Sequence, residues 1–484
     1  MDIKNLSIIE LHEKLKNKEF SVSELVNQTY KNLQAEMDSN FLVSLVEPEK
    51  DLDKKFDESN FLSGIPFVTK DNISVKNTLT TAGSKILSNY IAPFDATVSQ
   101  KLKEANSIVL GKATLDELGM GGTGLFGFNG EVRNPKDHSR IVGGSSSGSA
   151  YAVATGLVPF ATGTDTGDSI RKPASFNGIV GYKPTYGSIS RYGVIPYAPS
   201  LDHVGFFTRN VTDAAILADA TFKYDKKDFT SIDNTNEYFK NLNNPNQKIK
   251  FGFIKQVEEH MSGKLHDDYQ TICDKIREDG HELINLDFNK QLLDAIPAIY
   301  MMISFAEGVS THANLDGINF GLRAPGKDYA DIMKKSRAQG FGKTVKRRFV
   351  IGSYQLKSSN QEKLLAKSKK VRRLIIEELA RMYEQVDILI LPPALEVAPL
   401  VEQVMGTDIE ERKDNGSVFL EDVLILANMN GMPSITIPFV NYDNLPIGIN
   451  LNAKPKNDLL LLQASKYMED LIKKVVVKGG DFNE

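Results

Sequence analysis

Cysteine is almost absent from this sequence of 484 residues, which contains only Cys273. A single cysteine excludes a disulfide within the chain and a zinc site built from cysteine ligands. Long hydrophobic runs are also missing, since no apolar stretch approaches the ~18 residues that a membrane-spanning helix needs. The N-terminus, MDIKNLSIIELHEKLKNKEF, is charged and amphipathic, unlike a signal peptide. These absences predict a cytoplasmic protein with no membrane contact.

An excess of positive charge is missing as well. The chain has 58 Lys and Arg against 62 Asp and Glu, a formal net charge of -4. Because a nucleic-acid-binding domain usually carries excess positive charge, any RNA contact is expected to be local or made by a partner. The 41% hydrophobic and 25% charged residues are typical of a globular protein. They exclude a disordered chain, a collagen-like chain and a disulfide scaffold.

The length predicts two or three domains or one large α/β unit. Residues 1–60 are expected to be helical, because Ser7 with Glu10 and Ser21 with Glu24 have the spacing of capping boxes. Short apolar runs then alternate with Gly, Ser and Thr in three segments: 64–75, 107–122 and 151–163. Strands alternating with helices favour an α/β fold, and the many small residues suit a sheet packed by helices on both faces.

The second half of the chain is organised differently. Residues 222–248 are rich in Asn, Lys and Asp without periodicity, which predicts a surface connection between a first half, about 61–221, and a second half, 249–484. The second half opens with a β-α-β unit and contains a mostly helical, Lys- and Arg-rich insertion at 328–385. Its remaining elements are an apolar strand at 386–394, two further strands and a last helix.

Two familiar catalytic patterns fit the Gly- and Ser-rich segment 143–149 poorly. No lysine follows it at the spacing of a phosphate-binding loop. Ser146 satisfies the G-x-S-x-G pattern of a nucleophile elbow, but that pattern also needs a downstream acid and histidine. None of the histidines after it has a distinctive sequence context: His203, His260, His266, His281 and His312. Of these, His260, His266 and His281 are expected to face solvent.

A third pattern needs no histidine. A serine nucleophile can use a neutral lysine as its base if burial lowers the lysine pKa from its free value of ~10.4. Lys70 ends an apolar strand, and a serine between lysine and nucleophile can relay the proton. The turn 163–173 holds Ser169 beside backbone N–H groups that can bind an oxyanion. Taken alone, Ser169 is better explained as a helix N-cap and Lys70 as a surface lysine.

Together these segments resemble the amidase signature family, whose motifs match at four places: Gly64–Pro66 with Lys70–Asn72, Gly143–Ser149, Asp165–Pro173 and Gly181–Pro184. The spacings also fit, with 75 residues from Lys70 to Ser145 and 24 from Ser145 to Ser169. The resemblance implies an amidase-signature domain over 61–484, with a large mixed central sheet covered by helices on both faces.

The resemblance also implies a Ser-cisSer-Lys triad. Ser169 would be the nucleophile, Ser145 would relay the proton from a cis peptide bond, and Lys70 would be the base. The oxyanion hole would be formed by backbone N–H groups of the turn: Thr166, Gly167 and Asp168.

One residue of this turn departs from the family pattern. Asp168 stands where the family commonly has glycine, and its carboxylate must point away from a negative intermediate. Asp165 and Arg171 flank the turn and are either paired across it or two solvated charges.

Two blocks, 185–211 and 336–348, narrow the resemblance to the A subunits of aspartyl/glutamyl-tRNA amidotransferases. In that group an arginine at the position of Arg348 binds the α-carboxylate of glutamine, which suits its planar fork. Tyr300 matches another substrate-contacting position. Glu421 or Asp422 would hold the α-amino group. The spacing to Asn428 favours Glu421, whereas the residue type favours Asp422. The neighbouring cations are expected on a solvated helix face: Lys343, Lys346 and Arg347.

The resemblance therefore implies a glutaminase subunit. It would release ammonia from glutamine and pass it to a partner that activates Glu-tRNA(Gln) or Asp-tRNA(Asn) with ATP and Mg²⁺. Two further subunits, B and C, would complete a heterotrimer, and the partner would make most of the tRNA contact. No cofactor or metal is expected on this chain. The alternatives are a free-standing amidase, which needs no glutamine-holding Arg348, and a non-catalytic assembly subunit, which only Asp168 supports.

Overall fold

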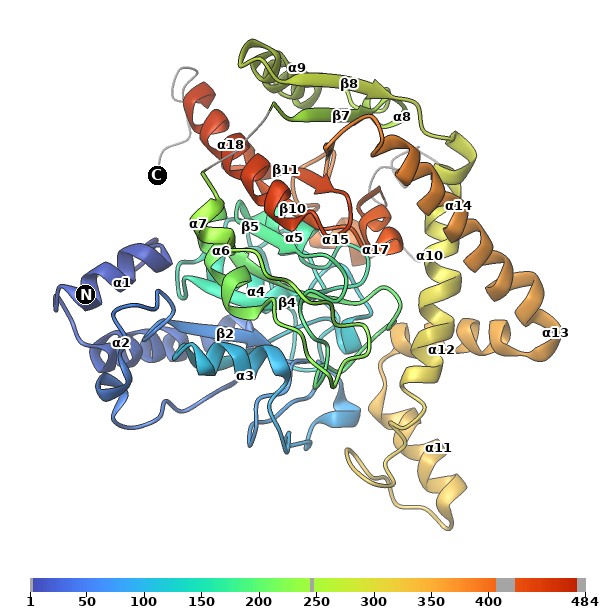
Figure 1. Ribbon diagram of the computed structural model, residues 1–484. Helices are drawn as coiled ribbons and strands as arrows, with labels where there is room; N and C mark the ends of the chain where they lie inside the picture. The colour runs from blue at the N-terminus through green and yellow to red at the C-terminus, as the bar shows by residue number, and fades with distance from the viewer. Residues whose placement is uncertain (1–2, 244–247, 406–422, 477–484) are drawn as a thin grey trace.

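A large mixed sheet forms the centre of the molecule (Figure 1). The computed structural model describes residues 3–243, 248–405 and 423–476. Within these ranges the sheet has 11 strands in the order β1-β3-β2-β4-β6-β5-β10-β11-β9-β7-β8. The strands are β1 (Leu42–Leu45), β2 (Pro66–Lys70), β3 (Ile108–Ala113), β4 (Phe160–Asp165), β5 (Val180–Lys183), β6 (His203–Thr208), β7 (Lys250–Ile254), β8 (Glu282–Leu286), β9 (Ile388–Leu391), β10 (Ser434–Tyr442) and β11 (Leu445–Ala453). Strand β2 runs parallel to β3 and β4, β7 runs parallel to β8 and β9, and the other pairs are antiparallel.

Helices surround the sheet. Those of the first half are α1 (Ile8–Lys16), α2 (Val22–Ala35), α3 (Thr97–Glu104), α4 (Ser147–Ala154), α5 (Arg171–Asn177), α6 (Val211–Thr221) and α7 (Tyr238–Asn241). Those of the second half are α8 (Lys255–Glu258), α9 (Gly263–Glu278), α10 (Lys290–Thr311), α11 (Tyr329–Gly340), α12 (Lys343–Leu356), α13 (Ser358–Gln361), α14 (Lys367–Met382), α15 (Val401–Met405), α17 (Leu426–Asn430) and α18 (Asp458–Val476). The predicted helices at the N-terminus and at 328–385 are confirmed. The expectation that all of residues 1–60 are helical is wrong, because Leu42–Leu45 form β1, an edge strand that pairs with β3.

The two faces of the sheet bury different side chains. On β10 and β11, Ile435 and Ile449 belong to the main apolar core, which also takes buried residues of α6 and α18. The alternate positions are small and polar, and they face α5: Gly448 donates its backbone N–H to Ser175 Oγ at 2.9 Å. Helices therefore cover both faces, as predicted, and α18 lies across β10 and β11 in Figure 1.

Both N-terminal helices begin with the predicted capping box. Ser7 Oγ accepts the backbone N–H of Glu10, and the Glu10 carboxylate accepts the backbone N–H of Ser7 at 2.7 Å. Ser21 and Glu24 repeat the arrangement at the start of α2. The division of the chain at residue 60 stays a prediction.

A second apolar core lies beneath α10, α12 and α14. Helix α10 corrects one expectation, because among the described residues it is the one helix long and apolar enough to cross a membrane by length and composition. Its 18-residue window has a mean hydropathy of 1.5, and 44% of that window is buried inside the molecule. Ile296 and Ile303 of this helix are buried in the second core, so burial against other helices accounts for its apolar composition.

Candidate active site

Lys70 lies at the end of β2, a strand whose residues are all buried. Its Nζ donates to Ser145 Oγ at 2.8 Å, to Thr164 Oγ1 at 2.8 Å and to the Thr164 carbonyl at 3.2 Å. Because β4 runs parallel beside β2, Thr164 is held directly against the lysine. Lys70 is 0% exposed, so it is not a surface lysine.

Burial has a large effect on this lysine. The loss of hydration lowers the pKa of Lys70 to about 7, although the carboxylates of Asp116, Asp165 and Asp202 partly oppose the shift. At neutral pH a substantial fraction of Lys70 is therefore uncharged. An uncharged amine that touches a serine hydroxyl can accept its proton.

Ser145 follows a cis peptide bond between Gly144 and Ser145, as the resemblance implied. The preceding glycine is required here by close approach, because a Cβ on Gly144 would lie 2.1 Å from Asp116 Oδ2. That buried carboxylate accepts the backbone N–H groups of Thr123, Gly124 and Phe126. Asp116 thus fixes the glycine loop beside the relay serine.

Ser146, the elbow alternative, is buried at the start of α4. Its hydroxyl donates to the Thr164 carbonyl at 3.0 Å. His203 is also buried, with Nδ1 2.7 Å from the Leu201 carbonyl, and burial lowers the pKa of its imidazole. His260 is exposed, as expected, whereas His266 and His281 are half-buried.

The turn that carries Ser169 joins β4 to α5 and is held by a buried ion pair. Arg171 donates to both carboxylate oxygens of Asp165, at 3.1 and 3.0 Å, and both side chains are 0% exposed. Burial alone would raise the pKa of Asp165, but the adjacent guanidinium outweighs it and lowers that pKa below the usual range. The two residues are therefore paired across the turn, not solvated.

The same arginine reaches the turn and the distant C-terminal part of the chain. Arg171 donates to the Gly167 carbonyl at 2.7 Å and to Asn428 Oδ1 at 2.7 Å. Asn428 Nδ2 in turn donates to Asp165 Oδ1 at 2.8 Å. Arg171 thus binds the Gly167 carbonyl of the turn, and Asn428 on α17 holds the Arg171 guanidinium in place.

Two further contacts brace the turn. Thr166 donates its hydroxyl to Asp202 Oδ1 at 2.7 Å, and Asp202 also accepts the backbone N–H of Tyr197. The Ser169 carbonyl accepts the backbone N–H of Ser146 at 3.4 Å, so the two serine-bearing segments lie side by side. The structure therefore brings the three predicted triad residues into one buried region.

Asp168, in the turn before α5, pairs with a lysine on that helix. Its Oδ2 lies 3.0 Å from Lys172 Nζ, four residues further along. The negative charge of Asp168 is thus balanced by a cation beside the turn.

Arg348 lies on α12, and its neighbours come from elsewhere in the chain. Its Nη1 donates to the Tyr197 hydroxyl at 3.3 Å, and its guanidinium lies 5.2 Å from the Phe305 ring centroid. Tyr300 lies over the turn, because a Cβ on Gly167 would be 3.1 Å from its ring. Tyr300, on α10, thus lies against the turn, and Arg348 is near enough to Tyr300 to interact with it electrostatically.

The remaining predictions concern the group that binds the α-amino group and the cations near Arg348. Glu421 and Asp422 lie outside the described residues, so the choice between them stays open. The three cations predicted on a solvated helix face are all exposed: Lys343, Lys346 and Arg347.

The start of α12 is anchored to the catalytic core. Glu117 accepts the backbone N–H of Gly342 at 2.9 Å and the hydroxyl of Ser84 at 2.5 Å. A Cβ on Gly342 would lie 2.5 Å from Glu117 Oε2, so a larger residue here would displace the Glu117 carboxylate. A carboxylate at a helix N-terminus satisfies a backbone donor and complements the helix dipole. Glu117 therefore ties the helix of Arg348 to the loop that follows β3.

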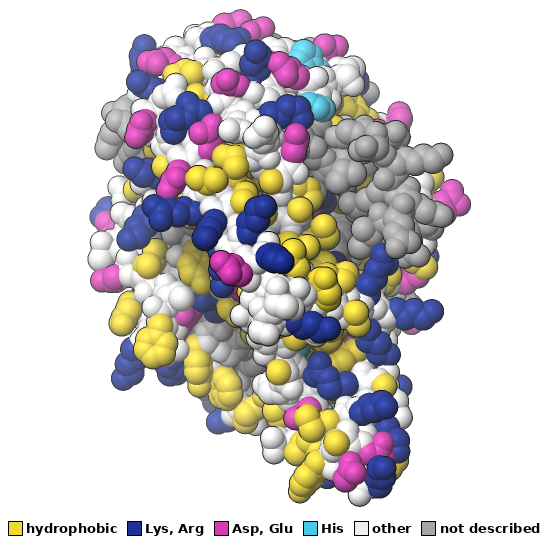
Figure 2. Space-filling model, turned by 90° about the vertical axis from the view of Figure 1, so that its right-hand side faces the viewer, with side chains coloured by type: hydrophobic (Ala, Val, Ile, Leu, Met, Phe, Trp, Pro, Cys, Tyr) yellow, Lys and Arg dark blue, Asp and Glu magenta, His cyan; other side chains and the backbone are white. Residues whose placement is uncertain are grey.

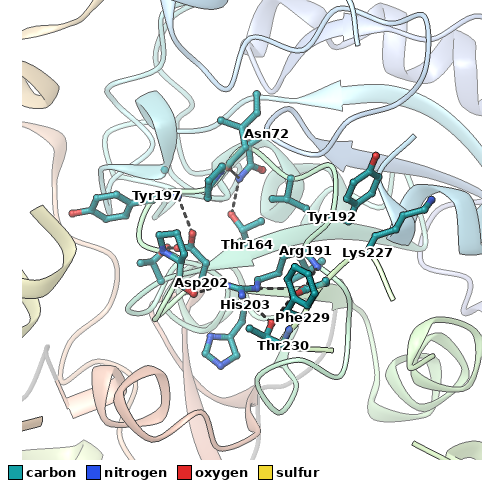
Figure 3. A pocket seen from close by; sticks show the side chains of 18 residues that line it. Asn72, Thr164, Arg191, Tyr192, Tyr197, Asp202, His203, Lys227, Phe229 and Thr230 are labelled. Atoms are coloured by element: carbon teal, nitrogen blue, oxygen red, sulfur yellow. Dashed lines mark hydrogen bonds and ion pairs between the residues drawn. The ribbon is translucent and has the colours of Figure 1, made fainter. Parts of the chain in front are cut away.

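A pocket of about 360 Å³ is lined by Thr164, which contacts Lys70, and by Thr166 of the turn that carries Ser169 (Figure 3). Asn72, Thr164 and Asp202 are buried residues of its lining, whereas Tyr192 and Lys227 are exposed. Asn72 Nδ2 donates to Thr164 Oγ1, the atom that also accepts from Lys70. Lys70 is therefore separated from the pocket by Thr164, which contacts both.

Sequence reasoning missed several supporting residues. Asn72 belongs to a motif that was recognised, and Tyr197 and Asp202 lie in the block 185–211, but no role was assigned to any of them. No sequence motif marks Glu117 or Thr164. Glu117 follows a strand, and Thr164 lies within one. Among the described residues, no group of three or more His, Cys, Asp or Glu is arranged to hold a metal ion.

Comparisons with known proteins agree with this arrangement. The family model described as Amidase matches residues 24–462. The chain is 40% identical over 474 residues to the A subunit of glutamyl-tRNA(Gln) amidotransferase from Mycoplasma genitalium, covering 96% of this chain and 98% of that protein. It is 36% identical to the protein of that name from Methanosarcina barkeri, covering 96% of each. The crystal structure of the corresponding A subunit from Thermotoga maritima matches with a TM-score of 0.79 and 31% identity, over 100% of this chain and 97% of that one. The chain therefore belongs to the amidase family.

Proposed function

We propose that this chain is the glutamine-hydrolysing subunit of a tRNA-dependent amidotransferase. The observation that carries the proposal is the buried contact between Lys70 Nζ and Ser145 Oγ, 2.8 Å long, beside the braced turn that ends on Ser169. Similarity along nearly the whole chain to proteins named as the A subunit of glutamyl-tRNA(Gln) amidotransferase supports the same function.

In the proposed reaction, Ser169 Oγ attacks the side-chain amide carbon of glutamine. Its proton passes to Ser145, whose own proton moves to uncharged Lys70. Backbone N–H groups of the turn stabilise the oxyanion: Thr166, Gly167 and Asp168. The intermediate collapses when Lys70, through Ser145, returns the proton to the leaving nitrogen, which departs as ammonia. Water then cleaves the γ-glutamyl ester and regenerates Ser169 with free glutamate.

Recognition of glutamine is assigned to the helical side of the site. Arg348 would bind the α-carboxylate, and Tyr300 would contact the substrate above the turn. Glu421 or Asp422 would bind the α-amino group. The half-buried position of Arg348, with Phe305 and Tyr197 beside it, supports a carboxylate-binding role because partial burial strengthens a charged hydrogen bond.

The released ammonia would be used on a partner. We propose two further subunits, B and C, in a heterotrimer, with ATP and Mg²⁺ acting on the partner that activates the aminoacyl-tRNA. The names of the relatives favour Glu-tRNA(Gln) over Asp-tRNA(Asn) as the acceptor. A cytoplasmic location fits an enzyme that acts on aminoacyl-tRNA.

The two alternatives differ from this proposal at identifiable residues. A free-standing amidase needs no carboxylate-binding Arg348. A non-catalytic assembly subunit was supported only by Asp168, and the ion pair with Lys172 weakens that support.

The test uses the chain assembled with its two partners. The assembly is given Glu-tRNA(Gln), ATP and either glutamine or ammonium chloride, and formation of Gln-tRNA(Gln) is measured. We expect Ser169→Ala to abolish the glutamine-driven reaction and to leave the ammonium-driven reaction unchanged. Loss of both reactions in a folded variant, or loss of neither, would contradict the proposal.

A further inference from the structure

The outer side of α12, α13 and α14 carries strong positive charge. From Lys343 to Arg373 the sequence has eleven Lys and Arg and a single acidic residue, Glu362. The chain as a whole has a net charge of -4, so this stretch differs in sign from the rest of the molecule. A local excess of this kind is the electrostatic footprint of a polyanion-binding surface.

Two of the eleven cations point inward. Arg348 faces the candidate active site, and Arg372 donates to the carbonyls of Ser200 and Met429 at 2.9 Å. The other nine are exposed and are here named the basic face: Lys343, Lys346, Arg347, Lys357, Lys363, Lys367, Lys369, Lys370 and Arg373. Figure 2 looks onto the side of the molecule formed by these helices, where dark blue side chains are widespread.

The charge pattern differs from that of an ordinary solvated helix. Helix α9 pairs its cations with acids three residues away, as in Lys275–Glu278 at 2.5 Å and Arg277–Asp274 at 2.7 Å. Helix α12 has no acidic residue, so it contains no such pair within its own sequence. Helix α14 has one at the end of the basic face, where Arg373 pairs with Glu377 at 2.8 Å.

Exposed apolar and aromatic side chains interrupt the basic face. Tyr354 is 56% exposed on α12, with Lys357 Nζ 5.9 Å from its ring centroid, and Leu374 is 50% exposed on α14. Cations interleaved with an exposed aromatic ring suit a nucleic acid, since phosphates bind the cations and unpaired bases stack on the ring.

We propose that the basic face binds the phosphate backbone of the tRNA whose amino acid is converted. This inference rests on the proposed function, which supplies an RNA substrate. Three residues of the basic face lie on α12, the helix that carries Arg348, so RNA bound here would lie close to the glutamine-binding helix. The near-neutral charge of the whole chain is compatible with this, because the contact is local.

The test measures binding of a fluorescently labelled tRNA transcript to the full chain over a range of salt concentrations. The test variant replaces Lys363, Lys367, Lys370 and Arg373 with Gln. The matched control replaces four exposed cations of the N-terminal region with Gln: Lys16, Lys18, Lys31 and Lys50. We expect the test variant to bind at least ~10-fold more weakly and with a shallower salt dependence, because each lost phosphate contact lowers the slope by about 1. The control should stay within about twofold of wild type, given that non-contacting surface charges act only weakly across a Debye length.

Several outcomes would overturn the inference. Wild-type chain that binds no tRNA would contradict it, as would a test variant that binds like the control. If the test variant keeps its tRNA affinity but no longer assembles with its partner subunits, the basic face is a protein interface and the RNA assignment is wrong. Glutamine hydrolysis measured on the same preparations separates the two claims. If the test variant hydrolyses glutamine normally and binds tRNA as well as wild type, only this inference is contradicted. If the wild-type chain in the full assembly does not hydrolyse glutamine, the proposed function is contradicted.

Discussion

The two sides of the candidate active site are held in place very differently. On the side of the sheet, Lys70, Asp165 and Arg171 are 0% exposed, and each makes several hydrogen bonds or ion pairs within the core. On the helical side, Arg348 donates to the Tyr197 hydroxyl at 3.3 Å and otherwise lies against aromatic rings. The groups assigned to bond breaking are thus fixed before substrate arrives. Among the described residues, the group assigned to substrate recognition donates to one hydroxyl, and its fork has further N–H donors that can bind substrate.

This difference has an energetic consequence. A charged group buried in a closed network costs several kcal/mol to disturb, so the sheet side is expected to tolerate almost no substitution. The helical side depends on how α12 is anchored, and Glu117 supplies that anchor. Changes on the sheet side should therefore abolish the chemistry, and changes on the helical side should weaken binding.

The largest effect is expected from the nucleophile. Ser169→Ala should lower the rate of glutamine hydrolysis about 10³-fold or more, because no ester can form without the hydroxyl. The matched control is Ser146→Ala, which removes a buried hydrogen bond worth about 1 kcal/mol but no proposed reacting group. Ammonia release and thermal unfolding of both variants check this, and a Ser146→Ala variant as inactive as Ser169→Ala would revive the elbow assignment.

The base should have the next largest effect, with a pH signature. Because burial lowers the pKa of Lys70 to about 7 and only the uncharged amine accepts a proton, kcat/KM should rise with pH and level off above about 7. Lys70→Ala should lose about 10²- to 10⁴-fold in rate. His203→Ala serves as the control, and a pH-independent wild-type profile between pH 5 and 9, or a folded His203→Ala variant as damaged as Lys70→Ala, would contradict the assignment.

Arg348→Ala should act on binding instead of chemistry. The loss of a charged hydrogen bond, ~1.5–3 kcal/mol, should raise the KM for glutamine roughly ten- to a hundredfold. An amide that lacks the α-carboxylate should be affected little, and Lys should replace Arg poorly because it lacks the planar fork. Steady-state kinetics on both substrates decide the matter, and unchanged glutamine kinetics would remove Arg348 from the site.

The smallest effect is expected at the anchor of α12. Glu117→Gln weakens the contact with the Gly342 N–H, a change of about 1 kcal/mol, so KM should rise severalfold while kcat stays close to wild type. The double variant Glu117→Gln/Arg348→Ala tests the route of the effect. If Glu117 acts through Arg348, the two changes should be less than additive in KM, whereas full additivity would show that the anchor acts elsewhere.

The sequence predicted the parts of the fold that local rules control. The capping boxes at Ser7 and Ser21 are local, so the N-terminal helices were predictable with their starts. The helices at 328–385 and the parallel β-α-β unit followed from composition and spacing. The order of the 11 strands did not, because it depends on pairings such as β5 with β10 that join residues far apart in the chain.

The site divides in the same way. Lys70, Ser145 and Ser169 lie in motifs whose spacing resembles a known family, so the sequence could name them. Asn428 and Glu117 could not be named, since their contacts span hundreds of residues and only folding brings them to Asp165 and Gly342. The motif also does not predict that Lys70 is buried, because its burial depends on β3 and β4, the strands on either side of β2.

The most direct test of the central claim is to identify the atom that becomes covalently attached to glutamine. The full assembly is treated with a glutamine analogue that carries a diazoketone in place of the amide and therefore alkylates the nucleophile that attacks it. Peptide mass spectrometry then locates the adduct, with free glutamine as competitor and Ser169→Ala as control. We predict one adduct, on the peptide that contains Ser169, prevented by glutamine and absent from the variant. An adduct on Ser146 or Ser145, or undiminished labelling of Ser169→Ala, would contradict the assignment of the nucleophile.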